Sequence, residues 1–275
     1  MSAVVRVRAP ASTANLGAGF DCAAVALDLW NELEVVEDGS GAEPDHLGVR
    51  AFALLASPDG LAFRFTDRIP RERGLGSSAA TVALGLVAAC ALAGREPDPE
   101  ELLALGSELE GHSDNLAAAL AGGVCLTWDG RIARIADDVP ATPIALVPDK
   151  GMKTAEARAL LPETVPREDA VFNVARAALL GAALARGDGE LFAAALADRL
   201  HEPYRSPFLG EVRGSLPAGA FGATLSGAGP GVIIWARPDA AASCEEELRG
   251  TYPDQLVLRL AVTPRGAGTL SVTSS

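Results

Sequence analysis

The sequence predicts an α+β protein built from two units, an N-terminal domain over residues 1–140 and a C-terminal domain over residues 141–275. Helical and strand-like segments alternate in both halves, as is typical of layered α/β or α+β units. Residues 136–143 contain two prolines and two aspartates, which favours a domain boundary there. The length of 275 residues and a hydrophobic content of 49% are sufficient for one large core or two modest cores.

The elements of the first half follow from local patterns. Alternating residues predict strands, and Asp98-Pro99-Glu100-Glu101 is a helix start with a cap, an early proline and acidic first-turn residues. Asp129-Gly130 predicts a hairpin turn. The small residues at 9–21 predict a loop, and His112 to Asn115 form a polar patch before a small-residue run. The predicted strands are 4–8, 24–36 (clearest at 34–36), 61–65, 124–128 and 131–135, and the predicted helices are 46–56, 79–93 and 98–110.

The second half repeats the alternation of helices and strands. A glycine-rich segment at 219–231 leads into an apolar strand, and the tail from Thr263 is predicted to be loose. The predicted strands are 144–147, 232–236 and 256–260, and the predicted helices are 154–161, 168–186, 189–200 and 240–249.

Composition excludes several classes of function. The formal net charge of −13 argues against a protein that binds nucleic acid or an anionic membrane surface. The four cysteines are widely spaced, so neither a zinc site nor a disulfide framework is indicated, and a cytoplasmic location is expected. The N-terminus lacks a signal-peptide pattern, and the apolar helix at 79–93 is too short to span a membrane.

A glycine- and serine-rich stretch, residues 70–81, is a candidate phosphate-binding loop. Gly74 and Gly76 permit a close approach of the backbone, and Ser77 and Ser78 are expected to cap the helix that follows and to offer hydroxyls to a metal. The free N–H groups of a first helical turn favour an anion. No Gly-Lys-Ser/Thr ends the stretch, so it is not a Walker A motif. The alternative interpretation is an ordinary turn with a capped helix.

Two more small-residue segments, Pro10 to Asp21 and Leu225 to Gly231, stand on either side of this loop in the sequence. Together the three segments resemble the three signature motifs of the GHMP kinases, a family named for galactokinase, homoserine kinase, mevalonate kinase and phosphomevalonate kinase. The resemblance covers nearly the whole chain. It implies a ribosomal S5 domain 2-like N-terminal domain, a ferredoxin-like C-terminal domain and a site in the cleft between them.

Within that family the motifs are most similar to those of the homoserine-kinase branch. Residues 12–21 and Glu110-Gly111-His112-Ser113-Asp114-Asn115 carry this similarity, as do residues 153–158 and 201–205. The resemblance implies transfer of phosphate from ATP to L-homoserine, a step towards threonine. The alternatives are another GHMP kinase that acts on an isoprenoid precursor or a sugar, and a catalytically silent family member that binds a metabolite. Only small-molecule substrates are expected, with a homodimer left open.

The chemistry of homoserine suits the residues of these motifs. A carboxylate needs a cationic fork, which Arg158 and Arg205 can supply, and an ammonium group needs an acceptor, which Asp21 with Asn15 can supply. His112 and Asn115 are expected at the hydroxyl end. The alternatives are an exposed Arg158 and a His112 that bonds only to the backbone. His201 is expected to orient the turn that carries Arg205.

The catalytic and metal-binding residues are predicted from the same motifs. Mg²⁺ favours oxygen ligands, which Glu110 and Ser78 (or Ser77) would provide, while Glu108 is an alternative on the same helix. Phosphoryl transfer needs positioning more than covalent chemistry, so Asn115 is expected to align the hydroxyl and Asp114 is the rival general base. The predicted catalytic set is Asn115, Asp114 and Arg205, and the predicted ATP-binding set is Arg71, Arg73, Gly74, Leu75, Gly76, Ser77, Ser78 and Ala79.

Overall fold

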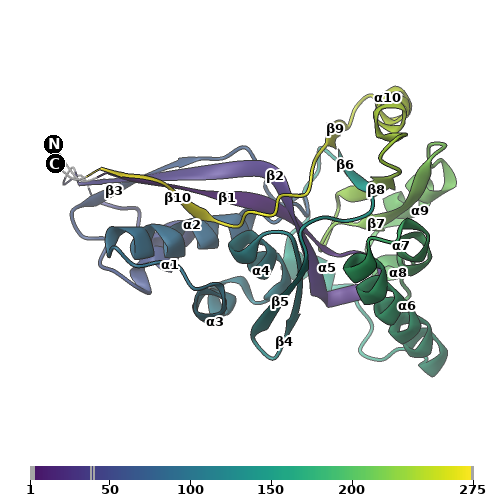
Figure 1. Cartoon of the computed structure of the whole chain (residues 1–275), viewed down its shortest axis with the longest axis horizontal. Coiled ribbons are helices and arrows are strands. Elements are labelled where there is room, and N and C mark those ends of the chain that lie inside the picture. Colours follow the sequence, from purple (N-terminus) through teal and green to yellow (C-terminus); the bar gives the residue numbers. More distant parts are fainter. Residues whose placement is uncertain (1–3, 38, 40, 274–275) are drawn as a thin grey trace.

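Two antiparallel sheets organise the chain, and the computed structural model describes residues 4–37, 39 and 41–273 (Figure 1). The first sheet has strand order β10-β1-β2-β4-β5, with β3 also paired to β2, and the second has the order β7-β8-β6-β9. The strands are β1 (Val4–Asn15), β2 (Gly19–Glu37), β3 (Leu61–Thr66), β4 (Val124–Trp128), β5 (Arg131–Ala136), β6 (Thr142–Val147), β7 (Ala220–Leu225), β8 (Val232–Ala236), β9 (Leu256–Arg259) and β10 (Gly268–Thr273).

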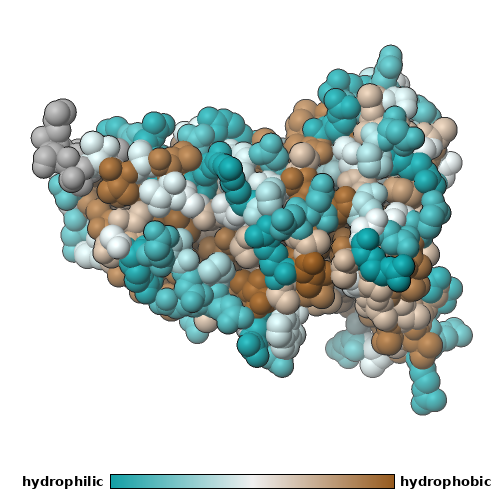
Figure 2. Space-filling view, in the orientation of Figure 1, coloured by the Kyte–Doolittle hydropathy of each residue, from teal (hydrophilic) through white to brown (hydrophobic). Residues whose placement is uncertain are grey.

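Helices cover both sheets, which confirms the predicted α+β class. They are α1 (Leu47–Ala53), α2 (Ser77–Leu92), α3 (Pro99–Glu110), α4 (Asp114–Ala121), α5 (Thr154–Ala159), α6 (Arg167–Arg186), α7 (Gly189–Ala195), α8 (Glu202–Arg205), α9 (Pro207–Gly214) and α10 (Ala241–Thr251). Within the described part of the chain, none of these helices is long and apolar enough to cross a membrane. Hydrophilic residues cover much of the face in Figure 2, and apolar residues gather over the exposed side of α6.

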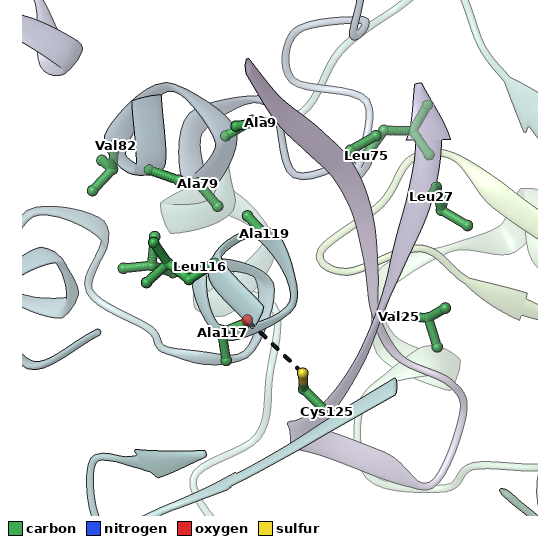
Figure 3. Packing of buried hydrophobic residues seen from close by; sticks show 14 of the residues in the cluster. Ala9, Val25, Leu27, Leu75, Ala79, Val82, Leu116, Ala117, Ala119 and Cys125 are labelled. Atoms are coloured by element: carbon green, nitrogen blue, oxygen red, sulfur yellow. Dashed lines mark hydrogen bonds between the residues drawn. The ribbon is translucent and has the colours of Figure 1, made fainter. Parts of the chain in front are cut away.

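The first core lies between the first sheet and helices α2, α3 and α4. Helix α2 is buried on nearly all sides, as its Ala-rich, apolar sequence predicts. Small side chains such as Ala79, Ala117 and Ala119 let α2 and α4 pack closely against β1 and β2 (Figure 3). Such close packing places the N-termini of both helices near the end of β1, where the site forms.

The second sheet is buried on both faces. Alternate residues of β6 and β8 point to opposite sides, as strand geometry requires. Ala145, Ile233 and Trp235 join the first core, whereas Ile144 and Ile234 pack with α9 and α10 in a second core. The division of the chain at residue 140 remains a prediction; the chain passes from the first sheet to the second between the end of β5 and the start of β6.

The predicted loop over residues 9–21 is wrong for most of its length. Strand β1 continues to Asn15, and β2 already begins at Gly19. The small residues are required because they pair with β2 while α2 and α4 pack against them. Only a tight reversal separates the strands, with positive φ at Asn15, Leu16 and Gly17.

The predicted loose tail is also wrong. Residues 268–273 form the edge strand β10, which pairs with Val4–Arg8 of β1. The side chains of β10 are mostly exposed, so no apolar alternation marks the strand. The chain therefore returns to its first sheet at the end, and the last part of the predicted tail, 274–275, lies outside the described residues, as do 1–3, 38 and 40.

Other differences are local. The last two residues of the polar patch, Asp114 and Asn115, belong to the same helix as the small-residue run, α4, with Asp114 in its acidic first turn. Helix α7 ends at Ala195 rather than at residue 200. Helices α8 and α9 were not predicted, and each begins beside a proline. The first part of the glycine-rich segment forms strand β7.

Candidate active site

A cavity of about 280 Å³ lies at the N-terminus of α2, and the predicted phosphate loop lines it. The predicted cap by Ser77 or Ser78 is wrong, because both serines already belong to α2: Gly76, with φ 65°, precedes the helix, and no side chain caps its first turn. The N–H groups of that turn are therefore available to an anionic ligand. The lining consists of Glu72, Arg73, Gly74, Leu75, Gly76, Ser77, Ser78, Ala79, Glu110, His112, Asn115, Met152, Lys153, Thr154, Gly227, Ala228 and Gly229.

Backbone contacts join the three predicted motifs at this cavity. The N–H of Ser12 donates to the Leu75 carbonyl at 3.2 Å, and the Ser226 hydroxyl donates to the Gly74 carbonyl at 2.7 Å. The N–H of Gly227 donates to the Ala14 carbonyl at 3.2 Å. Segments far apart in the sequence thus form one rigid frame around the cavity.

A second, smaller hollow adjoins the first and shares His112, Asn115, Thr154, Gly227 and Ala228 with it. The structure brings the predicted substrate-binding residues together here. The lining includes Asn15, Asp21, His112, Asp114, Asn115, Arg158 and Arg205.

Asp21 and Arg158 face each other across the smaller hollow. Two guanidinium nitrogens of Arg158 donate to the two carboxylate oxygens of Asp21, each at 3.0 Å. Both side chains are 39% exposed. In the absence of a zwitterionic ligand, the predicted anion-binding and cation-binding groups therefore neutralise each other.

The Asn15 side chain uses both of its polar groups in hydrogen bonds within the frame around the site. Its side-chain N–H donates to the Gly227 carbonyl at 2.8 Å, and its oxygen accepts from the N–H of Asp21 at 2.9 Å. The side chain is buried. Asn15 thus connects the third motif to the turn that presents Asp21, and its contact with an ammonium group stays a prediction.

His112 and Asn115 lie where the two hollows meet, and Asp114 lines the smaller one. The Ser12 hydroxyl donates to the Asn115 side-chain oxygen at 2.8 Å. The Asp114 carboxylate accepts the Asn115 N–H at 2.7 Å and lies 3.2 Å from His112 Nδ1. The nearby Asp114 carboxylate raises the pKa of His112 above its ordinary value, although burial opposes this shift. Asp114 is thus engaged with His112 rather than free in the cavity.

Glu110 and Ser78 form a pair of oxygen donors beside the phosphate loop. The Ser78 hydroxyl donates to the Glu110 carboxylate, whose side chain is only 3% exposed. Burial raises the pKa of Glu110, against the hydrogen bond from Ser78. A hydroxyl and a carboxylate at the mouth of an anion site suit Mg²⁺, which takes one or two protein oxygens together with phosphates and water. Glu108, the alternative ligand, is exposed.

The two arginines of the predicted ATP-binding set differ in position. Arg71 forms an ion pair with Asp67 and does not line the cavity. Arg73 lines it, but its guanidinium donates to the carbonyls of Pro148 and Arg71, at 2.7 and 2.9 Å. Leu75 and Ala79 are buried, so only their backbone groups are available to a ligand.

Sequence reasoning gave no site role to Met152, Lys153 or Thr154, all of which line the cavity together with the phosphate loop. The N–H of Met152 donates to the Glu72 carbonyl at 3.1 Å, which fixes the segment against the loop. Lys153 immediately precedes α5 and brings a cation to a cavity suited to phosphate. The available signal was that Lys153 is the first residue of the 153–158 motif, where a cation could add to the backbone N–H groups of a loop that has no lysine of its own.

Replacing Lys153 with alanine is expected to raise the KM for ATP about twofold to fivefold, since an exposed charge contact contributes up to about 1 kcal/mol. Initial rates over a range of ATP concentrations would measure this. Lys150→Ala is the matched control, because Lys150 is exposed and outside the cavity lining. An equal change in both variants would show that overall charge, rather than the position of Lys153, matters.

Comparison with known proteins agrees with this geometry. The family model of the GHMP kinase N-terminal domain matches residues 46–123, and that of the GHMP kinase C-terminal domain matches residues 181–254. A solved homoserine kinase from Cytophaga hutchinsonii has the same fold, with a TM-score of 0.85, 24% identity and coverage of 97% of each chain. The chain belongs to the GHMP kinase family.

Sequence relatives define the branch within that family. The chain is 41% identical to the homoserine kinase of Streptomyces coelicolor, over 100% of this chain and 97% of that protein. It is 40% identical to the homoserine kinase of Synechococcus sp., over 90% of each. The predicted resemblance to the homoserine-kinase branch is therefore confirmed.

Proposed function

We propose that this chain transfers the terminal phosphoryl group of ATP to the hydroxyl of L-homoserine, giving ADP and O-phospho-L-homoserine. The observation that carries the proposal is the junction of two hollows. One is built around the uncapped N-terminus of α2, and the other contains Asp21, Arg158 and Arg205. His112 and Asn115 line both, so a hydroxyl held in the smaller hollow would face phosphates held in the larger one.

The nucleotide end of the site relies on backbone dipoles. The N–H groups at Ser77, Ser78 and Ala79 would hold phosphate oxygens, because negative charge is favoured at a helix N-terminus. Bound Mg²⁺ would be held by Ser78 and Glu110 and would neutralise charge on the phosphates. Because the Glu110 side chain is almost fully shielded from water, its electrostatic attraction for a cation is stronger than that of an exposed carboxylate.

The amino-acid end of the site matches a zwitterion. Arg158 and Arg205 can together hold a carboxylate, and Asp21 can hold an ammonium group. The ion pair between Asp21 and Arg158 would open when the substrate binds. The substrate carboxylate would replace Asp21 as the partner of Arg158, and the ammonium group would replace Arg158 as the partner of Asp21. The charge balance of the hollow is then preserved, which reduces the cost of opening the pair.

The reaction itself needs alignment more than proton removal. Asn115 is held by Ser12 at the junction, so its amide can orient the substrate hydroxyl. The proton is then lost late, to the phosphoryl group being transferred. Asp114 is less suited to act as a base, because its carboxylate already accepts the Asn115 N–H and lies against His112.

A coupled ADP-release assay tests the proposed function. The panel contains L-homoserine, other hydroxy-amino acids, mevalonate and sugars. We expect turnover with L-homoserine and formation of the phosphate ester, identified by mass spectrometry. Preferred turnover of mevalonate or a sugar would assign the chain to another GHMP activity. No turnover, combined with a thermal shift on adding one ligand, would indicate a silent binder.

Replacing Asp114 with asparagine tests the absence of a strong base. We expect kcat to fall less than about tenfold, because positioning supplies most of the catalysis in phosphoryl transfer. Single-turnover rates at saturating substrates would measure the chemical step. A fall of several orders of magnitude, with unchanged thermal unfolding, would make Asp114 the base.

The expected cytoplasmic location and the homodimer that the sequence leaves open are proposals about the setting of the enzyme rather than its chemistry. Cell fractionation checks the first, and light scattering of the purified protein checks the second.

A further inference from the structure

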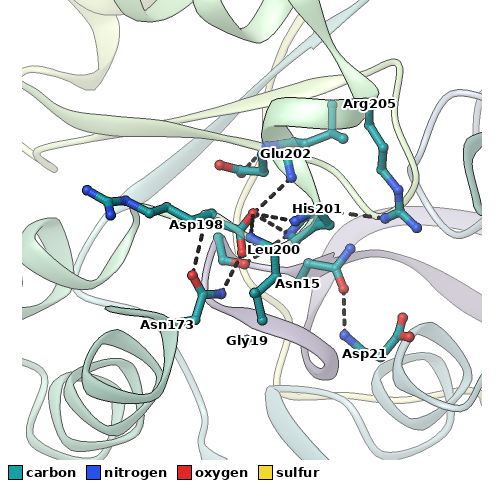
Figure 4. A network of polar contacts seen from close by, with 12 residues as sticks. Asn15, Gly19, Asp21, Asn173, Asp198, Leu200, His201, Glu202 and Arg205 are labelled. Carbon is teal, nitrogen blue, oxygen red and sulfur yellow. Dashed lines mark hydrogen bonds and ion pairs between the residues drawn. The ribbon is translucent and has the colours of Figure 1, made fainter. Parts of the chain in front are cut away.

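His201 lies beneath the smaller hollow, between the turn that follows β1 and the helix that carries Arg205. Its Nε2 is 3.0 Å from the Gly17 carbonyl. Its Nδ1 is 3.5 Å from a terminal nitrogen of Arg205, which lies beside it in Figure 4. The ring is fully buried and stacks on Phe20, with centroids 4.7 Å apart. Apart from the predicted role in orienting the Arg205 turn, the catalytic scheme gives this histidine no task.

The two contacts determine the protonation of the ring. A carbonyl only accepts, so Nε2 must carry the hydrogen that is directed at Gly17. A guanidinium only donates, so Nδ1 must be the unprotonated acceptor. His201 is therefore a neutral imidazole in one defined tautomer, and burial lowers its pKa in the same sense. The charged groups that act on it are Asp198, Arg205 and Asp21.

The segment before α8 is itself held in place. One oxygen of Asp198 accepts the N–H groups of Leu200, His201 and Glu202, at 3.1, 2.8 and 2.8 Å. Its other oxygen accepts from the side chain of Asn173 on α6, at 2.6 Å. The imidazole thus stands at a fixed point relative to α6.

We propose that His201 is a positioning residue that acts through Arg205, by giving its guanidinium a fixed acceptor at Nδ1. Arg205 has a second anchor, because its Nε donates to the Ala157 carbonyl at 3.3 Å. Ala157 precedes Arg158, so the two anchors hold Arg205 beside the other arginine of the hollow. The proposal rests on the proposed function, in which these two arginines hold the substrate carboxylate.

Three variants of His201 separate its two contacts. Asparagine places an acceptor near the position of Nδ1, glutamine places a donor near Nε2, and phenylalanine keeps only the ring. We expect the phenylalanine and glutamine variants to raise the KM for L-homoserine about tenfold, the effect of losing a hydrogen bond to a charged group. The asparagine variant should recover part of that loss. The KM for ATP and kcat should change less than about threefold, as expected for an effect confined to substrate binding.

Equal KM values for the asparagine and glutamine variants would overturn the proposal, as would lowered thermal stability with an unchanged KM. His46→Phe is the control, since His46 caps α1 outside both hollows.

Nitrogen-15 NMR of the labelled wild-type protein tests the same idea without mutation, because the chain has only three histidines. A neutral Nε2–H tautomer at pH 7 supports the proposal, and an Nδ1–H tautomer or an imidazolium contradicts it. The NMR result does not depend on turnover, so it remains decisive if L-homoserine is not the substrate.

Discussion

Replacing Glu110 with glutamine is expected to lower kcat about a hundredfold to a thousandfold, the range found when one preorganised electrostatic contact to a transition state is removed. The glutamine keeps the shape of the side chain and can still accept the hydrogen bond from Ser78. It lacks the charge that would hold Mg²⁺ against the phosphates. Steady-state rates at saturating ATP, L-homoserine and Mg²⁺ would measure the loss.

Glu108→Gln is the matched control, because Glu108 lies two residues earlier on α3 and is exposed. Its kcat should stay within about twofold of the wild-type value, as is usual for a surface change. The Glu110 variant should also unfold at the same or a higher temperature. Burial raises the folded-state pKa of Glu110, so its ionised form costs folding free energy at pH values above that pKa, and a neutral amide removes the cost. A fall in activity that accompanies a lower unfolding temperature would point to a structural role instead.

The predictions that succeeded rest on residues close together in the sequence. The start of α3 at Asp98 and its end at Gly111 are each defined by a few neighbouring residues, and the structure has them as predicted. One hollow brings together Asn15, Asp21, Arg158 and Arg205. This arrangement was predictable only through the family resemblance, because more than 100 residues separate the first two from the others.

The predictions that failed concern pairing between distant segments. Strand β10 carries exposed, mostly polar side chains, so nothing within it signals that it pairs with β1 at the other end of the chain. Residues 9–15 have the small side chains of a loop, but those side chains are small because helices pack over the strand. Lys153 was quoted without a role for the same reason: its place in the cavity depends on how residues 151–152 dock on Glu72 and Arg73.

The frame around the cavity explains why glycine is required at position 74. A Cβ atom on Gly74 would lie 2.1 Å from the Ser226 carbonyl oxygen, and the residue has φ of +80°. The backbones of Gly74 and Ser226 are held together by the hydrogen bond from the Ser226 hydroxyl to the Gly74 carbonyl, so neither can move without opening the junction of the second and third motifs. An added methyl group would therefore displace the phosphate loop from its partner.

We expect Gly74→Ala to lower the free energy of unfolding by about 3 kcal/mol, from left-handed backbone strain together with overpacking against the backbone. It should also raise the KM for ATP, because the loop would no longer hold its N–H groups at the cavity. Chemical denaturation and initial rates would measure the two effects.

Gly94→Ala is the matched control, since Gly94 has φ of +64° and open space around its Cβ position. That variant should lose only about 1 kcal/mol, the cost of the backbone conformation alone. Equal losses at the two positions would mean that the contact with Ser226 contributes nothing, and that the motifs are held together elsewhere.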